Sequence, residues 1–345
     1  MHFSHRMILI DATYVNVGGG MGLLRRLINE LRGRAEFALM RDIRVKDLDT
    51  VGCKVFDAAP DHFARRRFYQ AHGREFSRVL CFGNVPPLLR LPVPTATYFH
   101  NLLFCEEYPQ QSASDRRIAR LKMAYIRHYT PNTDTFLVQT ANMVSALQPI
   151  IAGRAQVAVQ PFFAFSRSPI QSSGARQWDQ FAYVSEAHPH KNHQRLLGAW
   201  RLLLARGLRP SLHLTVTSAY PALLAEISAL QTAGARITNH GYAPPAPIYA
   251  QCGYQIYPSL VESFGLGLIE AADAQCAVLA ADLPYVRAVV EPFAVFDPYS
   301  PESIADLVAR CSGHPAPASI TKVQDDLAGL LAWLSEGTPF QGLQT

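Results

Sequence analysis

The stretch from Tyr257 to Ala271 reads YPSLVESFGLGLIEA and combines the end of an apolar strand, a short loop and the start of a helix. Glu262 stands in the loop, and Glu270 follows about two turns along the predicted helix. The first N–H groups of a helix have no partner within it, so the backbone of Ser263, Phe264, Gly265 and Leu266 can hold phosphate or sugar oxygens. An ordinary helix explains one acidic residue near its start, but not a second one in an otherwise apolar helix.

Short apolar segments alternate with helical periodicity on both sides of this stretch, which predicts parallel sheets covered by helices on both faces. We expect strands at 7–12, 78–82, 95–99, 135–139, 157–159, 181–185, 212–217, 236–238, 254–257, 278–281 and 294–296. We expect helices at 23–31, 116–128, 142–149, 193–206, 221–233, 245–251, 265–275, 283–289, 301–310 and 321–334. The pattern predicts an α/β protein with two doubly wound sheets.

The 345 residues suffice for two domains of ordinary size. Residues 166–179 are rich in Ser, Pro, Gly and Gln and form the best linker candidate. We therefore expect a first domain at 1–165, a second at 166–320, and a C-terminal helix at 321–345 that crosses back to the first. Ligands of open α/β sheets bind at the carboxyl ends of the strands, so residues that follow strands are the site candidates.

Composition excludes several classes of protein. Apolar residues make up 49% of the chain and charged residues 17%, which argues against disorder. No apolar run is long enough to span a membrane, and the first residues, MHFSHR, do not open a signal peptide, so we expect a cytoplasmic protein. The six cysteines lie too far apart to form a zinc or redox pair, and we expect free thiols.

Charge is distributed unevenly along the chain. Residues 1–165 hold 21 Lys and Arg against 13 Asp and Glu, a net charge of +8, whereas the remainder holds 11 against 14, a net charge of −3. The basic half predicts an anionic partner for the first domain. Arg65, Arg66 and Arg67 form one cluster, with Phe68 and Tyr69 beside it. The helix at 116–128 carries the other, with Leu121, Ala124 and Tyr125 expected on its opposite face. Both are candidates for contact with anionic lipid headgroups, and a solvated helix face is the alternative. Nucleic acid is not expected, because no nucleic-acid-binding motif accompanies the charge.

A second motif, FAYVSEAHPHKNH, runs from Phe181 to His193. Lys191 stands at the start of the predicted helix, where a positive charge is unfavourable because it opposes the helix dipole. Its presence there indicates an anion to be bound, with His190 beside it. A surface cap is the alternative interpretation.

The first domain offers weaker candidates. Gly18 to Gly22 should form a turn between the first strand and a helix beginning at Leu23, and Gly19 and Gly20 lie within it. The spacing is not that of a dinucleotide-binding loop. His100 and Asn101 follow one expected strand and Asn84 follows another, which makes His100 a site candidate and the two asparagines candidates for the acceptor side.

Glu262, Glu270 and the intervening residues resemble the Glu-x7-Glu motif of retaining GT-B glycosyltransferases, in particular family 4 (glycosyltransferase group 1). The segments 277–284 and 296–305 are also similar to that family, and the resemblance extends over 181–307. It implies two Rossmann-like domains facing a central cleft. It also implies that Glu270 binds the ribose of the donor, that Glu262 and the 263–266 backbone bind the donor sugar, and that Lys191 binds the diphosphate. His100 would lie near the donor sugar, and Gly19 and Gly20 would approach the phosphate.

The resemblance implies a hexosyltransferase-type enzyme that moves a sugar, with retention, from a UDP- or GDP-sugar to a glycan or lipid-linked hydroxyl. It implies no metal and no cofactor, and a role in cell-surface polysaccharide synthesis. The basic first half predicts a peripheral position on the inner face of the cytoplasmic membrane. The family often has an arginine five or six positions before the lysine, where this chain has Glu186 and Ser185. A catalytically impaired nucleotide-sugar-binding partner and a GT-B epimerase are the alternatives.

Overall fold

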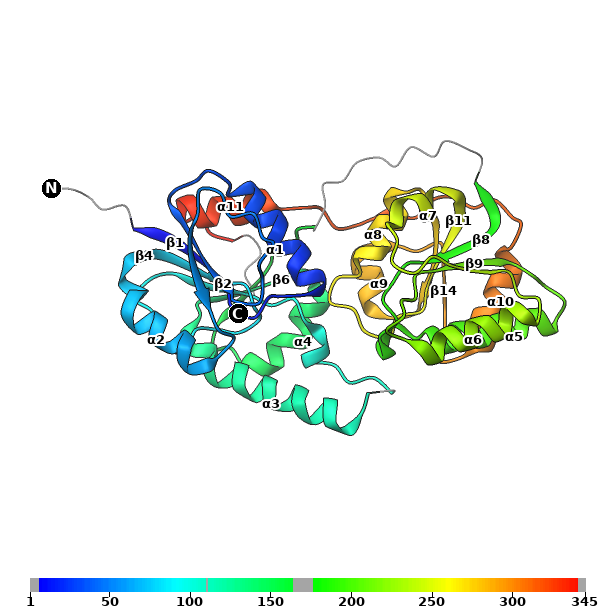
Figure 1. Cartoon of the computed structure of the whole chain (residues 1–345), viewed down its shortest axis with the longest axis horizontal. Coiled ribbons are helices and arrows are strands. Elements are labelled where there is room, and N and C mark those ends of the chain that lie inside the picture. Colours follow the sequence, from blue (N-terminus) through cyan, green and yellow to red (C-terminus); the bar gives the residue numbers. More distant parts are fainter. Residues whose placement is uncertain (1–5, 110, 164–175, 341–345) are drawn as a thin grey trace. The chain divides into compact units, whose positions relative to one another are not determined.

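The computed structural model describes residues 6–109, 111–163 and 176–340. The chain divides into two compact units (Figure 1). The first unit comprises Met1–Glu106, Ala113–Ser166 and Gln324–Thr345, and the second comprises Glu107–Ser112 and Arg167–Val323. The C-terminal segment thus belongs to the first unit, although the whole second unit precedes it in the sequence.

A seven-stranded sheet forms the centre of the first unit. Its strands are β1 (Met7–Ala12), β2 (Phe37–Asp42), β3 (Lys54–Ala58), β4 (Phe76–Cys81), β5 (Thr95–Tyr98), β6 (Thr135–Val138) and β7 (Gln156–Val159). They are all parallel, in the order β3-β2-β1-β4-β5-β6-β7. The order reverses between β1 and β4, so the carboxyl ends of these two strands flank the crevice where doubly wound sheets bind ligands.

Five α-helices accompany this sheet: α1 (Gly18–Glu30), α2 (His62–His72), α3 (Ala113–Tyr129), α4 (Ala141–Ile151) and α11 (Leu327–Glu336). Successive side chains of β1 point to opposite faces of the sheet, as the two-residue period of a strand requires. Ile8 and Ile10 pack in one core with residues of α1 and α11, whereas Leu9 packs in another with Tyr69 of α2. Figure 1 shows α11 beside α1.

The second unit contains a six-stranded parallel sheet. Its strands are β8 (Gln177–Tyr183), β9 (Ser211–Leu214), β10 (Ile237–Asn239), β11 (Cys252–Tyr257), β12 (Ala277–Ala281) and β14 (Ala294–Phe296), in the order β10-β9-β8-β11-β12-β14. The helices are α5 (His193–Ala205), α6 (Pro221–Thr232), α7 (Pro245–Gln251), α8 (Leu266–Asp273), α9 (Pro284–Val289) and α10 (Pro301–Cys311). The order reverses between β8 and β11, the two strands that precede Lys191 and Glu262.

Smaller elements complete the described chain. Strands β13 (Val290–Glu291) and β15 (Ile320–Thr321) form an antiparallel pair. Four 3-10 turns are η1 (Gly73–Glu75), η2 (Leu102–Phe104), η3 (Thr130–Asn132) and η4 (Pro189–Lys191).

The predicted fold class, two doubly wound α/β sheets, is confirmed. β2, β3 and α2 were not predicted, because charged residues end the apolar run at 37–42 and flank the one at 54–58, and 62–72 has three consecutive arginines between its apolar residues. The expected linker also differs, because its last residues lie in β8 from Gln177 onwards. Residues 166–175 of that linker lie outside the described residues. No helix of the described residues is long and apolar enough to cross a membrane.

The prediction of a glycine turn before a helix at Leu23 is wrong, since α1 already begins at Gly18. Gly18 has a φ of 70°, and Val17 precedes the helix without a side-chain cap. The glycines therefore form the first turn of the helix, and their N–H groups belong to its N-terminus. The six cysteines are free thiols, and four of them are buried.

Candidate active site

The loop after β11 is held against the turn after β8 by hydrogen bonds to one carbonyl. Leu260 N donates to His190 O at 2.8 Å, and Ser259 Oγ donates to the same oxygen at 3.3 Å. From the other side, the hydroxyl of Tyr285 in α9 donates to Ser259 O at 2.7 Å. All four residues are buried, and their polar atoms would otherwise lack partners, which is costly. The loop that carries Glu262 therefore has a defined backbone path.

Asn192 joins three strand ends of the second unit. Its Nδ2 donates to Pro258 O at 3.0 Å, after β11, and to Pro298 O at 2.8 Å, after β14. Its own backbone, after β8, has a φ of 63°, in the left-handed region that asparagine tolerates better than most residues. Its Oδ1 accepts from Arg195 Nη1 at 3.0 Å, and the first turn of α5 has no side-chain cap.

Lys191 and Glu262 form an ion pair at this point. Lys191 Nζ lies 2.5 Å from Glu262 Oε1, and the two side chains are only 17% and 10% exposed. The hydroxyl of Tyr257, the last residue of β11, donates to the same Oε1 at 2.8 Å. Burial raises the pKa of Glu262, but the charge and hydrogen bond of Lys191 outweigh it and leave the pKa below its usual value. Glu262 is therefore an ionised, acceptor-only carboxylate.

His190 precedes this lysine and is almost fully buried. Burial and the neighbouring charge of Lys191 lower the pKa of His190 to about 4. At neutral pH it is uncharged, so it can exchange hydrogen bonds with a ligand but cannot neutralise a phosphate. The cation of this loop is Lys191.

Helix α8 begins directly after the loop. Gly265 adopts a φ of 73° at its N-cap, a conformation that favours glycine, and Leu266 is its first residue, after Ser263 and Phe264. A Cβ on Gly267 would lie 3.1 Å from Cε2 of Tyr257, so this glycine lets the helix pack on the tyrosine ring. The close neighbours of Gly267 are side chains of β11 and α7.

Glu270 lies in the second turn of α8 and is half-buried. Burial, together with the charge of Asp273 one turn further on, raises the pKa of Glu270 to about 7. A carboxylate with few stabilising partners in a dry setting is a strong acceptor for hydroxyl groups brought by a ligand.

Three candidates of the first unit lie together. The backbone N of His100, after β5, donates to Asn84 Oδ1 at 2.7 Å, after β4. His100 Nε2 lies 3.2 Å from Phe82 O, and burial lowers the pKa of His100 to about 4. A Cβ on Gly20 would lie 2.6 Å from His100 Cε1, whereas a Cβ on Gly19 would meet nothing within 4 Å. Only glycine at position 20 allows α1 to approach the imidazole this closely.

Within the predicted cluster of Arg65, Arg66 and Arg67, the last two are exposed, but Arg65 is not the surface residue that the sequence suggested. Arg65 is 1% exposed, and its Nε donates to Asp11 Oδ2 at 2.7 Å. Its NH1 and NH2 donate to Pro86 O at 2.7 Å and Val85 O at 3.0 Å. Tyr69 is also buried and donates to Asp11. The buried arginine neutralises Asp11 and holds the segment after Asn84, so it is not available to a lipid surface.

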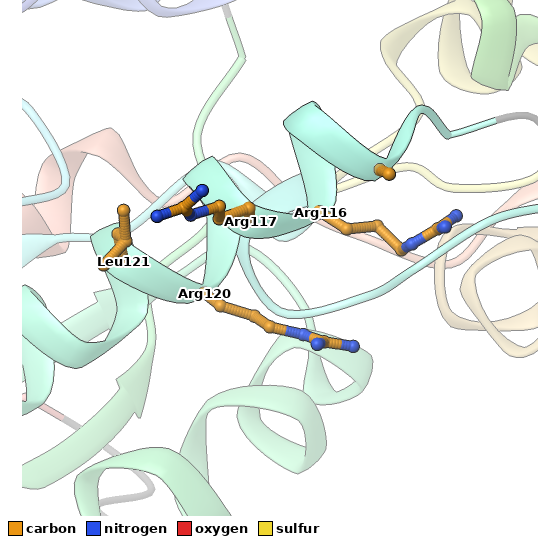
Figure 2. Close-up of a pocket in the computed structure, with 5 residues that line it drawn as sticks. Arg116, Arg117, Arg120 and Leu121 are labelled. Atoms are coloured by element: carbon orange, nitrogen blue, oxygen red, sulfur yellow. The ribbon is translucent and has the colours of Figure 1, made fainter.

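Helix α3 does carry an exposed basic surface. A pocket of about 460 Å³ is lined by Ala113, Arg116, Arg117, Arg120 and Leu121, here called the α3 arginine pocket. Figure 2 shows these side chains on successive turns, with Arg116 and Arg120 extending to the same side. Leu121, expected on the face opposite the arginines, lines the same pocket and is 63% exposed, whereas the buried residues of α3 are Met123 and Ile126.

Sequence reasoning did not find several residues that build these sites. Asn192 and the Asp11–Arg65 pair were missed because their partners lie far away in the chain. Tyr257 was missed because its hydrogen bond to Glu262 depends on how the loop after β11 folds back. A weak signal exists for Asp11, a charge at the end of an otherwise apolar strand, which requires a buried counter-charge. Among the described residues, no group of three His, Cys, Asp or Glu side chains is placed to hold a metal ion.

Residues 172–315 match the family described as "Glycosyl transferases group 1". The match contains Lys191, Glu262 and Glu270. The predicted resemblance to glycosyl transferases group 1 is confirmed for this domain, while family 4 and retention stay predictions. No curated protein matches the chain significantly.

Solved glycosyltransferase structures resemble most of the chain, across both units. Anabaena Alr3699/HepE in complex with UDP and glucose has a TM-score of 0.62 at 16% identity, covering 89% of this chain and 90% of that one. Sucrose-phosphate synthase from Thermosynechococcus elongatus has a TM-score of 0.64 at 14% identity, covering 88% and 89%. The lipopolysaccharide outer core galactosyltransferase WaaB has a TM-score of 0.58 at 15% identity, covering 89% of each chain. At these identities the similarity establishes the fold, which is GT-B.

Proposed function

We propose that this protein is a retaining glycosyltransferase that moves a sugar from a nucleotide diphosphate sugar to a hydroxyl group of a glycan or lipid-linked acceptor. The observation that carries the proposal is the buried Lys191–Glu262 pair at the carboxyl end of a parallel sheet, directly before α8. It lies within the domain that matches glycosyl transferases group 1. The complex of HepE with UDP-glucose supports a nucleotide sugar as the donor.

Departure of the nucleotide diphosphate is the difficult step of the reaction, because negative charge develops on its phosphate oxygens. Lys191 would stabilise that charge, together with the backbone N–H groups at the start of α8, from Ser263 to Leu266. His190 is uncharged and would contribute only a hydrogen bond. The phosphate charge is therefore met mainly by one lysine and one helix N-terminus, and no bound metal is part of the proposal.

The two glutamates would hold the rest of the donor. Ionised Glu262 would accept hydrogen bonds from hydroxyls of the sugar, and Glu270 from those of the ribose. From the first unit, His100, Gly19 and Gly20 are assigned to donor contacts. Retention of configuration fits a substitution on one face of the sugar, in which the leaving phosphate takes the proton of the acceptor hydroxyl.

A membrane-linked acceptor is favoured by the basic first unit. Helix α3 carries four arginines and a lysine against one aspartate, and Ile118 and Leu121 are exposed beside the arginines. Basic side chains next to exposed apolar ones are typical of helices that lie on anionic lipid surfaces. We assign the protein to the cytoplasmic face of a membrane, in cell-surface polysaccharide synthesis.

A second candidate is a nucleotide-sugar-binding partner without turnover. The observation that favours it is Glu186, which stands near the position where glycosyltransferases of this type often have an arginine. Its carboxylate lies 3.1 Å from His188 Nε2. An acidic side chain there adds nothing to the neutralisation of phosphate.

Nucleotide binding and turnover separate these candidates. UDP, GDP and their glucose conjugates are titrated in a thermal-shift assay, and release of free nucleotide diphosphate is then followed with the donor that binds. We expect Lys191→Ala and Glu262→Ala to lower turnover at least a hundredfold, because each removes a charge that contacts the reacting group. Lys322→Ala, a surface lysine of the same unit, is the control. Donor binding without release would favour the second candidate, and turnover that survives both substitutions would refute the site.

A further inference from the structure

We propose that Tyr257 is a positioning residue for donor-sugar recognition, which fixes one oxygen of Glu262 and thereby directs the other oxygen to the sugar. The inference rests on the proposed function, because it concerns the carboxylate assigned to the donor sugar. Tyr257 belongs to β11, outside the loop and helix that carry the motif.

Hydrogen bonds to Glu262 are concentrated on a single oxygen. Oε1 accepts from Lys191 Nζ at 2.5 Å and from the Tyr257 hydroxyl at 2.8 Å. These two hydrogen bonds both reach Oε1, and the Ser259 hydroxyl also favours the ionised form of this carboxylate. Oε2 is the atom whose lone pairs are left for a ligand, and a carboxylate oxygen can accept two hydroxyl protons.

The tyrosine ring is itself held firmly. Tyr257 is 3% exposed, and its ring lies edge-on to that of Tyr183, with 5.5 Å between centroids. Gly267 of α8 packs against its other edge, where a Cβ would lie 3.1 Å from Cε2. A side chain confined by β8 and α8 in this way can place its hydroxyl more reproducibly than a flexible lysine can.

The two groups that donate hydrogen bonds to Oε1 respond differently to a bound nucleotide sugar. Lys191 is a charged, flexible group that a diphosphate attracts, and binding phosphate weakens its bond to Glu262. Tyr257 is neutral, so a diphosphate does not compete for it. When Lys191 turns to phosphate, the Tyr257 hydrogen bond still prevents the carboxylate from rotating.

The charges around Glu262 keep the hydroxyl of Tyr257 protonated, so that it remains a hydrogen-bond donor. Lys191, His190 and Ser259 lower the pKa of Glu262. The charge of Glu262 in turn raises the pKa of the three buried tyrosines around it, Tyr183 of β8, Tyr257 of β11 and Tyr285 of α9. Burial and then the charge of Glu262 raise the pKa of Tyr257 well above its usual value, so its hydroxyl stays protonated. A hydrogen bond given to a carboxylate favours the ionised form, so its loss raises the pKa of the carboxylate.

The first test needs no ligand. Carboxyl carbons of glutamate are labelled with carbon-13, and the Glu262 resonance is identified by its absence in Glu262→Gln. In Tyr257→Phe, which removes only the hydroxyl, we expect the titration midpoint of Glu262 to rise by about one pH unit. Tyr254→Phe is the matched control, because Tyr254 lies in the same strand and its hydroxyl donates to His314 O at 2.6 Å, away from Glu262. An unchanged midpoint in Tyr257→Phe would overturn the proposal.

The second test uses UDP and UDP-glucose as probes in calorimetric titrations. We expect Tyr257→Phe to raise the Kd of UDP-glucose about tenfold and to change the Kd of UDP less than twofold, because UDP has no sugar for Glu262 to bind. In a Glu262→Gln background the same change should have no further effect. An equal rise in the Kd of both ligands, or no rise in either, would contradict the role of Tyr257 without contradicting the proposed function. A wild-type chain that binds neither nucleotide refutes the proposed function and the sugar role with it.

Discussion

Glu270 should make the stability of the second unit depend on pH in a direction opposite to that of most carboxylates. The perturbation is Glu270→Gln, which keeps the size of the side chain and removes its titration. Burial and Asp273 raise the pKa of Glu270 from 4.5 to about 7, so the folded state holds a proton that the unfolded state releases. A difference of about 2.5 pH units corresponds to about 3 kcal/mol.

The sign follows from which state binds the proton. Below pH 4.5 both states are protonated and the stabilising effect of the raised pKa is fully present. As the pH rises to about 7, the folded state must give up the proton in a dry setting, and the stability of wild type relative to Glu270→Gln falls by about 3 kcal/mol. Above that range the difference should be constant.

Urea unfolding of both proteins between pH 4 and 9, followed by tryptophan fluorescence, measures this difference. Glu302→Gln, which removes an exposed carboxylate at the start of α10, controls for the loss of one negative charge. A difference between wild type and Glu270→Gln that does not change with pH would refute the reasoning. If Glu270 binds ribose as a carboxylate, saturating UDP should also move the descending part of the curve to lower pH.

Three further predictions concern the other parts of the molecule. Lys191→Met should destabilise the second unit by about 3 kcal/mol at pH 7, because it leaves Glu262 charged and unpaired, and adding Glu262→Gln should restore most of the loss in urea unfolding. Gly20→Ala should displace His100 and lower turnover at least tenfold, measured as release of nucleotide diphosphate, whereas Gly19→Ala should lower it less because a Cβ there meets no atom of the protein within 4 Å. Wild type should co-sediment with phosphatidylglycerol vesicles at low salt, and about 0.5 M NaCl should reverse this binding. Replacing the three arginines of the α3 arginine pocket with glutamine should abolish it. Absence of wild-type binding at low salt would contradict the membrane assignment.

The fold was largely predictable because its signals are local. Most strands of both sheets are short apolar runs that end in a polar or turn residue, and helices such as α5 and α10 have a clear apolar face. The elements that were missed, β2, β3 and α2, have exposed or charged residues in place of that contrast. Arg65 illustrates the limit, because a surface arginine and a buried one are identical in a sequence, and only the position of Asp11 distinguishes them.

Residue order alone predicts the alternation of strands and helices, and it contains the Glu-x7-Glu spacing and the excess of positive charge in the first half. These depend on residue order and on periodicity, which the chain carries wherever it is placed. The contact of Lys191 with Glu262 is visible only in the folded chain. So are the hydrogen bond from Tyr257 to the same Oε1 and the packing of α11 in a core of the first unit. Strand order brings Lys191 and Glu262 together, because β8 and β11 are neighbours in the sheet although two strands separate them in the chain. Side chains at their carboxyl ends therefore meet through the sheet, where sequence distance has no influence.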